Sequence, residues 1–408
     1  MIKKRKFKLF STIGDEEIKI TTKVLKSGIL SGFIANPNKL DGGKYNKLFE
    51  QKIKKFYNCK HAILVNSWTS GLIACVGSLD INPGDEIIVS PWTMSATATA
   101  ILHWNAIPIF ADIDPKTFCI DVEKVKKLIT KKTKAIITVD IFGHPSNVRY
   151  LKHIVEGKNI KIIADSAQSP YSFYGKKLAG TITDIGGYSL NCHKHIQTGE
   201  GGIVVTNNNN LANRVRLLRN HAEVTVKKSN TKINNLLGFN FRMGEIEAAI
   251  GIEQLKKLKK IIKSKQQQAL YLTKKLKVLE GLIVPSIEKN CTHSYYGYPM
   301  VLNLKKIKFT RKKLVQELNK QGLPGFMEGY QNLHLLPIYQ RKIAYGNKGF
   351  PWSTFKPKLS YKKGLCPIAE QLHQETFLNF EICKYDLSKA DIDFITNKFI
   401  KIWKKLQD

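Results

Sequence analysis

The chain has 408 residues, of which 43% are hydrophobic and 10% aromatic, so it is long enough for two domains with apolar cores. It contains neither an apolar run near the roughly 20 residues of a membrane-spanning helix nor a secretory signal. Its seven scattered cysteines form no C-x-x-C pair, which favours a cytoplasmic protein with reduced thiols. The net charge of +34 is spread along the chain without a nucleic-acid-binding motif, so we interpret it as lysine on solvated faces; a nucleic-acid partner is the disfavoured alternative.

Short apolar runs alternate with helical patterns through the first half of the chain. Several runs are β-branched and apolar throughout, which is typical of strands buried on both faces of a mostly parallel sheet. We therefore expect an α/β domain whose functional residues follow the strands, at the carboxyl edge of the sheet. The expected strands are 62–65, 86–90, 107–111, 135–139, 160–164, 185–190 and 203–206, and the expected helices are 69–79, 95–103, 122–130 and 147–155.

The pattern changes after about residue 251. A long helix rich in Lys, Gln and Leu is expected over 252–279, and a last helix begins at a capping box formed by Ser388 and Asp391. We accordingly place a large domain at 1–255 and a smaller α+β domain at 256–408.

Polar residues follow two of the expected strands. Ser67, Trp68 and Thr69 open a helix, where free backbone N–H groups favour a phosphate, although any strand-to-helix turn prefers capping residues of this kind. Asp165 ends a buried run. A carboxylate there needs a cation, such as a protonated pyridine nitrogen, unless it simply caps the next helix.

Lys194 lies between His193 and His195 in a stretch that ends in the Gly-rich segment 199–202. Burial and nearby positive charge both favour loss of the lysine proton, which a Schiff-base lysine requires. A metal site at the two histidines is the disfavoured alternative, because no third histidine lies nearby in sequence. Asn240 and Arg242 precede a later helix, either as part of its cap or as polar groups of a site.

Taken in order, these segments resemble the DegT/DnrJ/EryC1/StrS family of sugar aminotransferases, which depend on pyridoxal 5'-phosphate (PLP). The resemblance covers most of the chain, from a helix and turn at 16–32, through Pro83-Gly84-Asp85-Glu86, to Asn240-x-Arg242-Met243. It implies an aspartate-aminotransferase-like fold, fold type I of the PLP enzymes. It also implies a homodimer whose active sites are shared between the subunits.

The resemblance also implies a role for each motif residue. Lys194 would carry PLP as a Schiff base, Asp165 would pair with the pyridine nitrogen, and Gln168 would lie near the ring hydroxyl. The usual aromatic cover of the ring is displaced by two positions, so either Met94 or Trp92 would cover it. The phosphate would be held by Ser67, Trp68, Thr69 and Ser189, with Asn240 reaching in from the partner subunit.

Lysine at position 194 favours transamination over the dehydration that a neighbouring, histidine-bearing branch of the family performs. Glutamate or glutamine would donate the amino group, and a keto-sugar, usually nucleotide-linked, would accept it for surface-glycan synthesis. The phrases around Lys194 and at 343–352 resemble a subgroup of 8-amino-3,8-dideoxy-octulosonate transaminases, which use a free acidic keto-sugar. A sugar dehydratase and a non-catalytic regulatory homologue are the alternatives. Second-domain candidates for substrate contact, or for core packing, are His293, Tyr296, Tyr330 and His334.

Overall fold

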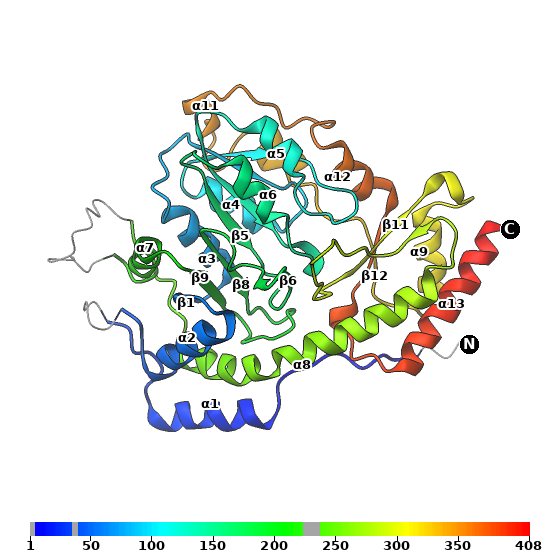
Figure 1. Cartoon of the computed structure of the whole chain (residues 1–408), viewed down its shortest axis with the longest axis horizontal. Coiled ribbons are helices and arrows are strands. Elements are labelled where there is room, and N and C mark those ends of the chain that lie inside the picture. The colour runs from blue at the N-terminus through cyan, green and yellow to red at the C-terminus, as the bar shows by residue number, and fades with distance from the viewer. Residues whose placement is uncertain (1–4, 35–39, 223–236) are drawn as a thin grey trace.

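A seven-stranded sheet forms the centre of the computed structural model, which describes residues 5–34, 40–222 and 237–408 (Figure 1). The strand order is β1-β9-β8-β5-β4-β2-β3, and β9 runs in the opposite direction to the other six strands. Each bound agrees with the sequence prediction to within two residues, which confirms the mostly parallel sheet. The strands are β1 (His61–Val65), β2 (Glu86–Val89), β3 (Ile107–Phe110), β4 (Thr133–Val139), β5 (Lys161–Asp165), β8 (Ile185–Ser189) and β9 (Gly202–Thr206).

Helices cover both faces of this sheet, which explains why its strands are apolar nearly throughout. In β1, Ile63 and Val65 join the core beneath α3 and α4, whereas Ala62 and Leu64 face the opposite core with α2. The helices of this part are α1 (Asp15–Ser27), α2 (Lys44–Tyr57), α3 (Trp68–Gly77), α4 (Ser95–Leu102), α5 (Val122–Leu128), α6 (Val148–Ile154) and α7 (Asn209–Arg219), with the short helix η2 (Ile141–Gly143) and a small ribbon of β6 (Phe173–Tyr174) and β7 (Lys177–Leu178).

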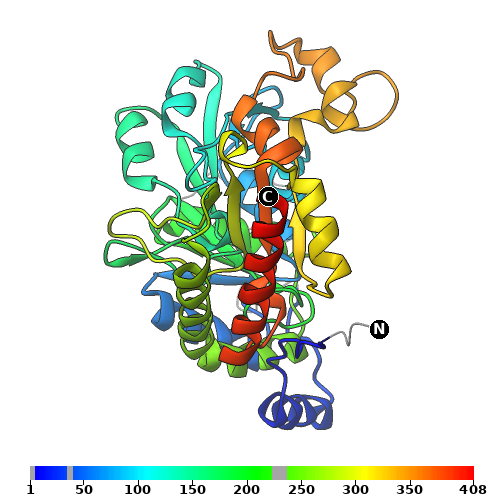
Figure 2. The same cartoon turned by 90° about the vertical axis from the view of Figure 1, so that its right-hand side faces the viewer.

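The 32-residue helix α8 (Glu245–Leu276) connects the large sheet to a second core (Figures 1 and 2). That core lies around a four-stranded antiparallel sheet in the order β10-β11-β13-β12. The predicted boundary at 255/256 falls inside α8 and stays a prediction. The elements are β10 (Leu282–Ile283), β11 (Tyr298–Leu302), η3 (Leu304–Lys306), α9 (Arg311–Lys320), β12 (Phe326–Glu328), η4 (Leu333–Leu335), α10 (Pro337–Gln340), α11 (Trp352–Phe355), α12 (Pro367–Gln371), η5 (Leu372–Thr376), β13 (Phe377–Phe380), η6 (Ile382–Lys384) and α13 (Lys389–Gln407).

The last helix and the N-terminal segment lie side by side next to this second core (Figure 2). Helix α13 begins at the predicted capping box, in which Ser388 and Asp391 each accept a hydrogen bond from the other's backbone N–H. Near the N-terminus, Leu9 pairs with Tyr385, and the chain then continues to α1, which packs on α8. None of the helices within the described ranges combines the length and the apolar character needed to cross a membrane.

Candidate active site

The register of the large sheet brings three predicted site segments to one edge. Val65 at the end of β1 and Ser189 at the end of β8 both pair with Gly202 of the intervening strand β9. Asp165 at the end of β5 pairs with Gly187, two residues before the end of β8. The turn after β1, the Asp165 carboxylate and Ser189 therefore lie at neighbouring points of the carboxyl edge.

The turn after β1 offers donors for an anion. Ser67 caps helix α3, and its side chain accepts a hydrogen bond from the backbone N–H of Ser70 at 3.1 Å. Within the described residues, the backbone N–H groups of Trp68 and Thr69 have no hydrogen-bond partner. Such free amides at a helix N-terminus suit a phosphate group.

Asp165 is buried, with 4% of its surface exposed, and its carboxylate accepts three hydrogen bonds. Oδ1 accepts from the indole Nε1–H of Trp68 at 2.7 Å and from the backbone N–H of Ala167 at 3.2 Å. Oδ2 accepts from the hydroxyl of Thr97 at 2.7 Å. These donors offset the cost of burying the charge, and they hold the carboxylate in one orientation.

Lys194 lies in the loop that joins β8 to β9, and its amine extends into a cavity. Burial lowers the pKa of the amine below the ordinary lysine value, while the carboxylate of Asp165 acts in the opposite direction. The Nζ atom lies 4.2 Å from the ring centroid of Tyr296. An amine with a lowered pKa spends more time unprotonated and is a better nucleophile near neutral pH.

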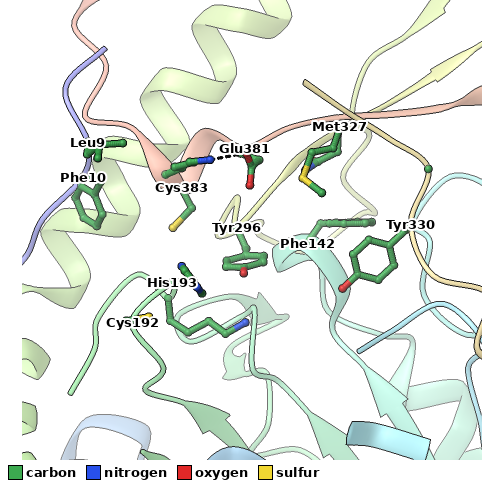
Figure 3. Close-up of a pocket in the computed structure, with 14 residues that line it drawn as sticks. Leu9, Phe10, Phe142, Cys192, His193, Tyr296, Met327, Tyr330, Glu381 and Cys383 are labelled. Carbon is green, nitrogen blue, oxygen red and sulfur yellow. Dashed lines mark hydrogen bonds and ion pairs between the residues drawn. The ribbon is translucent and has the colours of Figure 1, made fainter. Parts of the chain in front are cut away.

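The cavity around Lys194 has a volume of about 510 Å³ and lies between the large sheet and the second core (Figure 3). Phe142, Tyr296 and Tyr330 form part of its wall, and Figure 3 shows their rings gathered on one side. On another side, Glu381 forms an ion pair with Lys384 at 3.1 Å. The N-terminal residues Leu9 and Phe10 and the second-core residues Met327 and Cys383 also line it.

The two histidines that flank Lys194 have different surroundings. His193 is exposed and lines the cavity. His195 is fully buried, its Nε2 lies 2.9 Å from the carbonyl oxygen of Ser294, and burial lowers its pKa to about 3. They therefore do not converge on one point, and no group of three or more metal-binding side chains was found among the described residues.

Gln168 connects the loop after β5 to the cavity wall. Its Oε1 accepts a hydrogen bond from the backbone N–H of Phe142 at 2.7 Å, and its Nε2 donates weakly to the hydroxyl of Tyr330 at 3.4 Å. Burial raises the pKa of Tyr330, so this hydroxyl stays protonated at neutral pH. Gln168 is thus held at the cavity by contacts on both ends of its amide.

The structure separates the two candidates for covering the cofactor ring. Trp92 is completely buried against Phe377, with ring centroids 5.1 Å apart. Met94 precedes helix α4, is 65% exposed and lines a second cavity together with Tyr330. The geometry therefore favours Met94 over Trp92.

Asn240 lies on the surface beside the turn that opens α3. The neighbouring backbone carbonyl of Phe241 accepts a hydrogen bond from the N–H of Asn66 at 2.9 Å. The Asn240 side chain is bonded to Arg242, whose Nε donates to its Oδ1 at 2.8 Å. Within the described part of the chain it forms no hydrogen bond with Ser67 or Thr69, so its predicted role depends on a partner subunit.

Of the four second-domain candidates, only Tyr296 and Tyr330 line the cavity. His334 is buried, with its Nε2 2.9 Å from the Glu370 carboxylate, and His293 is buried against Tyr295. Thr97, which donates to Asp165, was not among the predicted site residues. Its position one helical turn after Thr93, close to the end of β2, could have indicated it.

Residues 14–377 match the model of the DegT/DnrJ/EryC1/StrS aminotransferase family. The spore coat polysaccharide biosynthesis protein SpsC of Bacillus subtilis is 31% identical over 346 residues, covering 83% of this chain and 86% of SpsC.

Two solved structures share the whole architecture. Helicobacter pylori PseC, an aminotransferase involved in the biosynthesis of pseudoaminic acid, has a TM-score of 0.81 and 25% identity, covering 99% of this chain and 100% of PseC. Escherichia coli GDP-4-keto-6-deoxy-D-mannose-3-dehydratase with bound hydrated PLP has a TM-score of 0.77 and 27% identity, covering 97% and 99% of the two chains. These matches confirm the predicted family, its PLP fold type and PLP as its cofactor.

Proposed function

Because the chain belongs to the DegT/DnrJ/EryC1/StrS aminotransferase family, we propose that it transfers an amino group from glutamate or glutamine to a keto-sugar in the cytoplasm, for surface-glycan synthesis. The observation that carries the proposal is the Lys194 amine, which extends into a cavity, has a lowered pKa and is influenced by the charge of Asp165. A lysine in these surroundings is suited to form a bond to a carbonyl carbon.

The residues at the carboxyl edge fit PLP. The amides of Trp68 and Thr69 are free to bind its phosphate, and the Ser189 hydroxyl lies at the same edge. Asp165 supplies an anion for a pyridine nitrogen, and Lys194 supplies the amine. PLP, when bound, provides an electron sink for the negative charge that develops on a substrate carbon.

Each side chain then has a defined task. The Lys194 amine would accept and return a proton at Nζ. Asp165 would hold a proton on the ring nitrogen, and the free amides would orient the phosphate. Gln168 would lie near the ring hydroxyl, and Met94 would cover the ring face. Asn240 would complete the phosphate site of the partner subunit.

For the acceptor, we favour a nucleotide-linked keto-sugar, since the E. coli relative is named for such a substrate. The octulosonate alternative stems partly from residues 343–352, and none of these lines the cavity around Lys194. Instead, Tyr345 contacts Asn105 of the large domain through its hydroxyl. The position of that segment therefore does not support the acidic eight-carbon sugar as the acceptor.

We also propose a homodimer. Apolar side chains are exposed along the N-terminal helix and the segment after it, including Ile18 and Leu25, one heptad apart, and Ile29. The exposed Asn240 and Met94 would be covered by the same association. Sedimentation velocity tests this, with a dimer expected and a monomer contradicting it.

The first experiment is an absorbance spectrum of the protein with added PLP, before and after excess glutamate or glutamine. A yellow band that fades with one donor supports transamination and identifies that donor. Reduction of the yellow protein with borohydride, followed by peptide mass mapping, should find the cofactor on Lys194. Lys384, which lines the same cavity and is paired with Glu381, is the matched control and should carry none.

Several results would contradict the proposal. A yellow band that responds to neither donor points to another amino donor. Absence of any band supports the non-catalytic alternative, and label on Lys384 would move the cofactor to the other side of the cavity. Once a donor is known, a nucleotide-linked keto-sugar and a free acidic eight-carbon keto-sugar are compared as acceptors by mass spectrometry.

A further inference from the structure

The side chain of Trp68 leaves the phosphate turn and occupies a slot between α3 and the sheet. It is only 5% exposed and belongs to the core beneath α3. Two glycines make the slot: a Cβ at Gly71 would lie 2.6 Å from the indole, and one at Gly187 would lie 2.3 Å from it. Space for the indole therefore depends on the absence of side chains at both positions.

From this slot, the indole reaches the carboxylate of Asp165. A buried carboxylate has about four lone-pair sites, two on each oxygen. Trp68 and Ala167 take both sites on Oδ1, and Thr97 takes one on Oδ2. The site that remains is on Oδ2. The indole thus determines which oxygen of Asp165 is available to a further partner.

We infer that Trp68 is a positioning residue, whose indole N–H fixes the Asp165 carboxylate so that Oδ2 is presented to the ring nitrogen of the cofactor. The inference rests on the proposed function, because the partner of Oδ2 is the cofactor. The backbone N–H of Trp68 keeps its separate task at the phosphate. One residue therefore serves both ends of the cofactor, through its main chain and its side chain.

A tryptophan that only fills space would not need an anion as its acceptor. Trp104 illustrates that role in the same domain. It packs against Gly77 of α3, and its indole N–H donates to the backbone carbonyl of Ile73 at 2.7 Å. Trp104→Phe is therefore a matched control for Trp68→Phe, since each change removes one indole N–H bond and keeps an aromatic ring.

The test compares the two variants with the wild-type holoenzyme. For Trp68→Phe, we expect the rate of cofactor conversion by the amino donor to fall about tenfold, the scale of one bond to a charged group. We also expect the pH midpoint of the cofactor's absorbance change to move upward, because a less protonated ring nitrogen makes the chromophore a weaker acid. Trp104→Phe should leave both measurements at their wild-type values.

Equal behaviour of the two variants would overturn the inference and leave the proposed function intact. Failure of the wild-type protein to develop any cofactor band would overturn both together. If Trp68→Phe does not fold, ¹⁵N NMR of the wild-type indole groups decides the question. The Trp68 signal, assigned by replacing the other four tryptophans, should shift when PLP is added. An unchanged Trp68 signal would refute the inference.

Discussion

Replacing His195 with phenylalanine tests how the loop that carries Lys194 is anchored. His195 is fully buried, and Nε2 lies 2.9 Å from the carbonyl oxygen of Ser294, a residue of the second core region. Burial is the main cause of its lowered pKa, and the nearby charges of Lys265 and Lys194 lower it further. The ring is therefore neutral in the folded protein, with the Nε2 proton donated to Ser294.

The magnitude follows from the pKa of about 3 in the folded state and 6.5 in the unfolded chain. The unfolded state binds a proton between these values and the folded state does not, so stability falls as the pH drops below 6.5. At pH 5 the loss is about 2 kcal/mol, since each pH unit in this window corresponds to about 1.36 kcal/mol. At pH 7 no such loss is present.

The stability cost of replacing His195 with phenylalanine should therefore depend on pH. At pH 7, His195→Phe leaves the Ser294 carbonyl without its donor, and we expect it to cost about 1–3 kcal/mol. At pH 5 the wild type has lost about 2 kcal/mol of stability that the variant cannot lose. The difference in unfolding free energy between wild type and variant, which we call the gap, should therefore shrink by that amount. Urea unfolding of the cofactor-free protein at both pH values measures the gap.

The matched control is His193→Phe, because His193 is exposed in the same loop. This variant should show the same pH dependence as the wild type. An equal gap between His195→Phe and the wild type at pH 7 and pH 5 would refute the reasoning. It would mean that the folded protein admits a proton on His195.

Three further predictions concern the site itself. Lys194→Ala should abolish amino transfer while the melting curve of the cofactor-free protein stays cooperative; turnover by the folded variant would disprove the assignment. Asp165→Asn should slow amino transfer at least about 100-fold, the scale of losing one preorganised electrostatic partner, and a near-normal rate would make Asp165 structural only. Gly187→Ala should cost about 3 kcal/mol or more in urea, because the new Cβ meets the Trp68 indole and the Ile203 carbonyl. Gly14→Ala, with its nearest contact at 3.6 Å, should cost little.

The sheet could be predicted from the sequence because buried parallel strands read as continuous apolar runs. Because parallel strands end at one edge of a sheet, the sequence also predicted that Ser67, Asp165 and Ser189 lie close together. The sequence likewise indicated helix after Arg242 and over 252–279, and the structure joins the two into one helix that begins at Glu245. These features depend on neighbours in sequence or on a rule of topology.

Other features depend on residues far apart in the chain, and local patterns do not reveal them. The direction of the Trp68 side chain depends on Gly187, a strand residue far along the chain from the α3 helix. The burial of His195 depends on Ser294, 99 residues away. His334 illustrates the same difficulty, because Glu370, with which it forms a buried hydrogen bond, lies 36 residues further along the chain.

The family contains both aminotransferases and a dehydratase among the relatives of this chain, so the choice between them depends on the loop after β8. His195 is hydrogen-bonded to the Ser294 carbonyl inside the protein, and it would have to break this bond to turn toward a substrate. His193 is exposed at the cavity, whereas the Lys194 amine lies close enough to Asp165 for that carboxylate to influence its pKa. A nucleophilic amine near the anion that would hold the ring nitrogen is the arrangement that amino transfer requires, since the same group must both bond to the cofactor and move a proton. Neither histidine takes the position of the Lys194 amine, because one is buried elsewhere and the other is exposed. The loop therefore favours transamination.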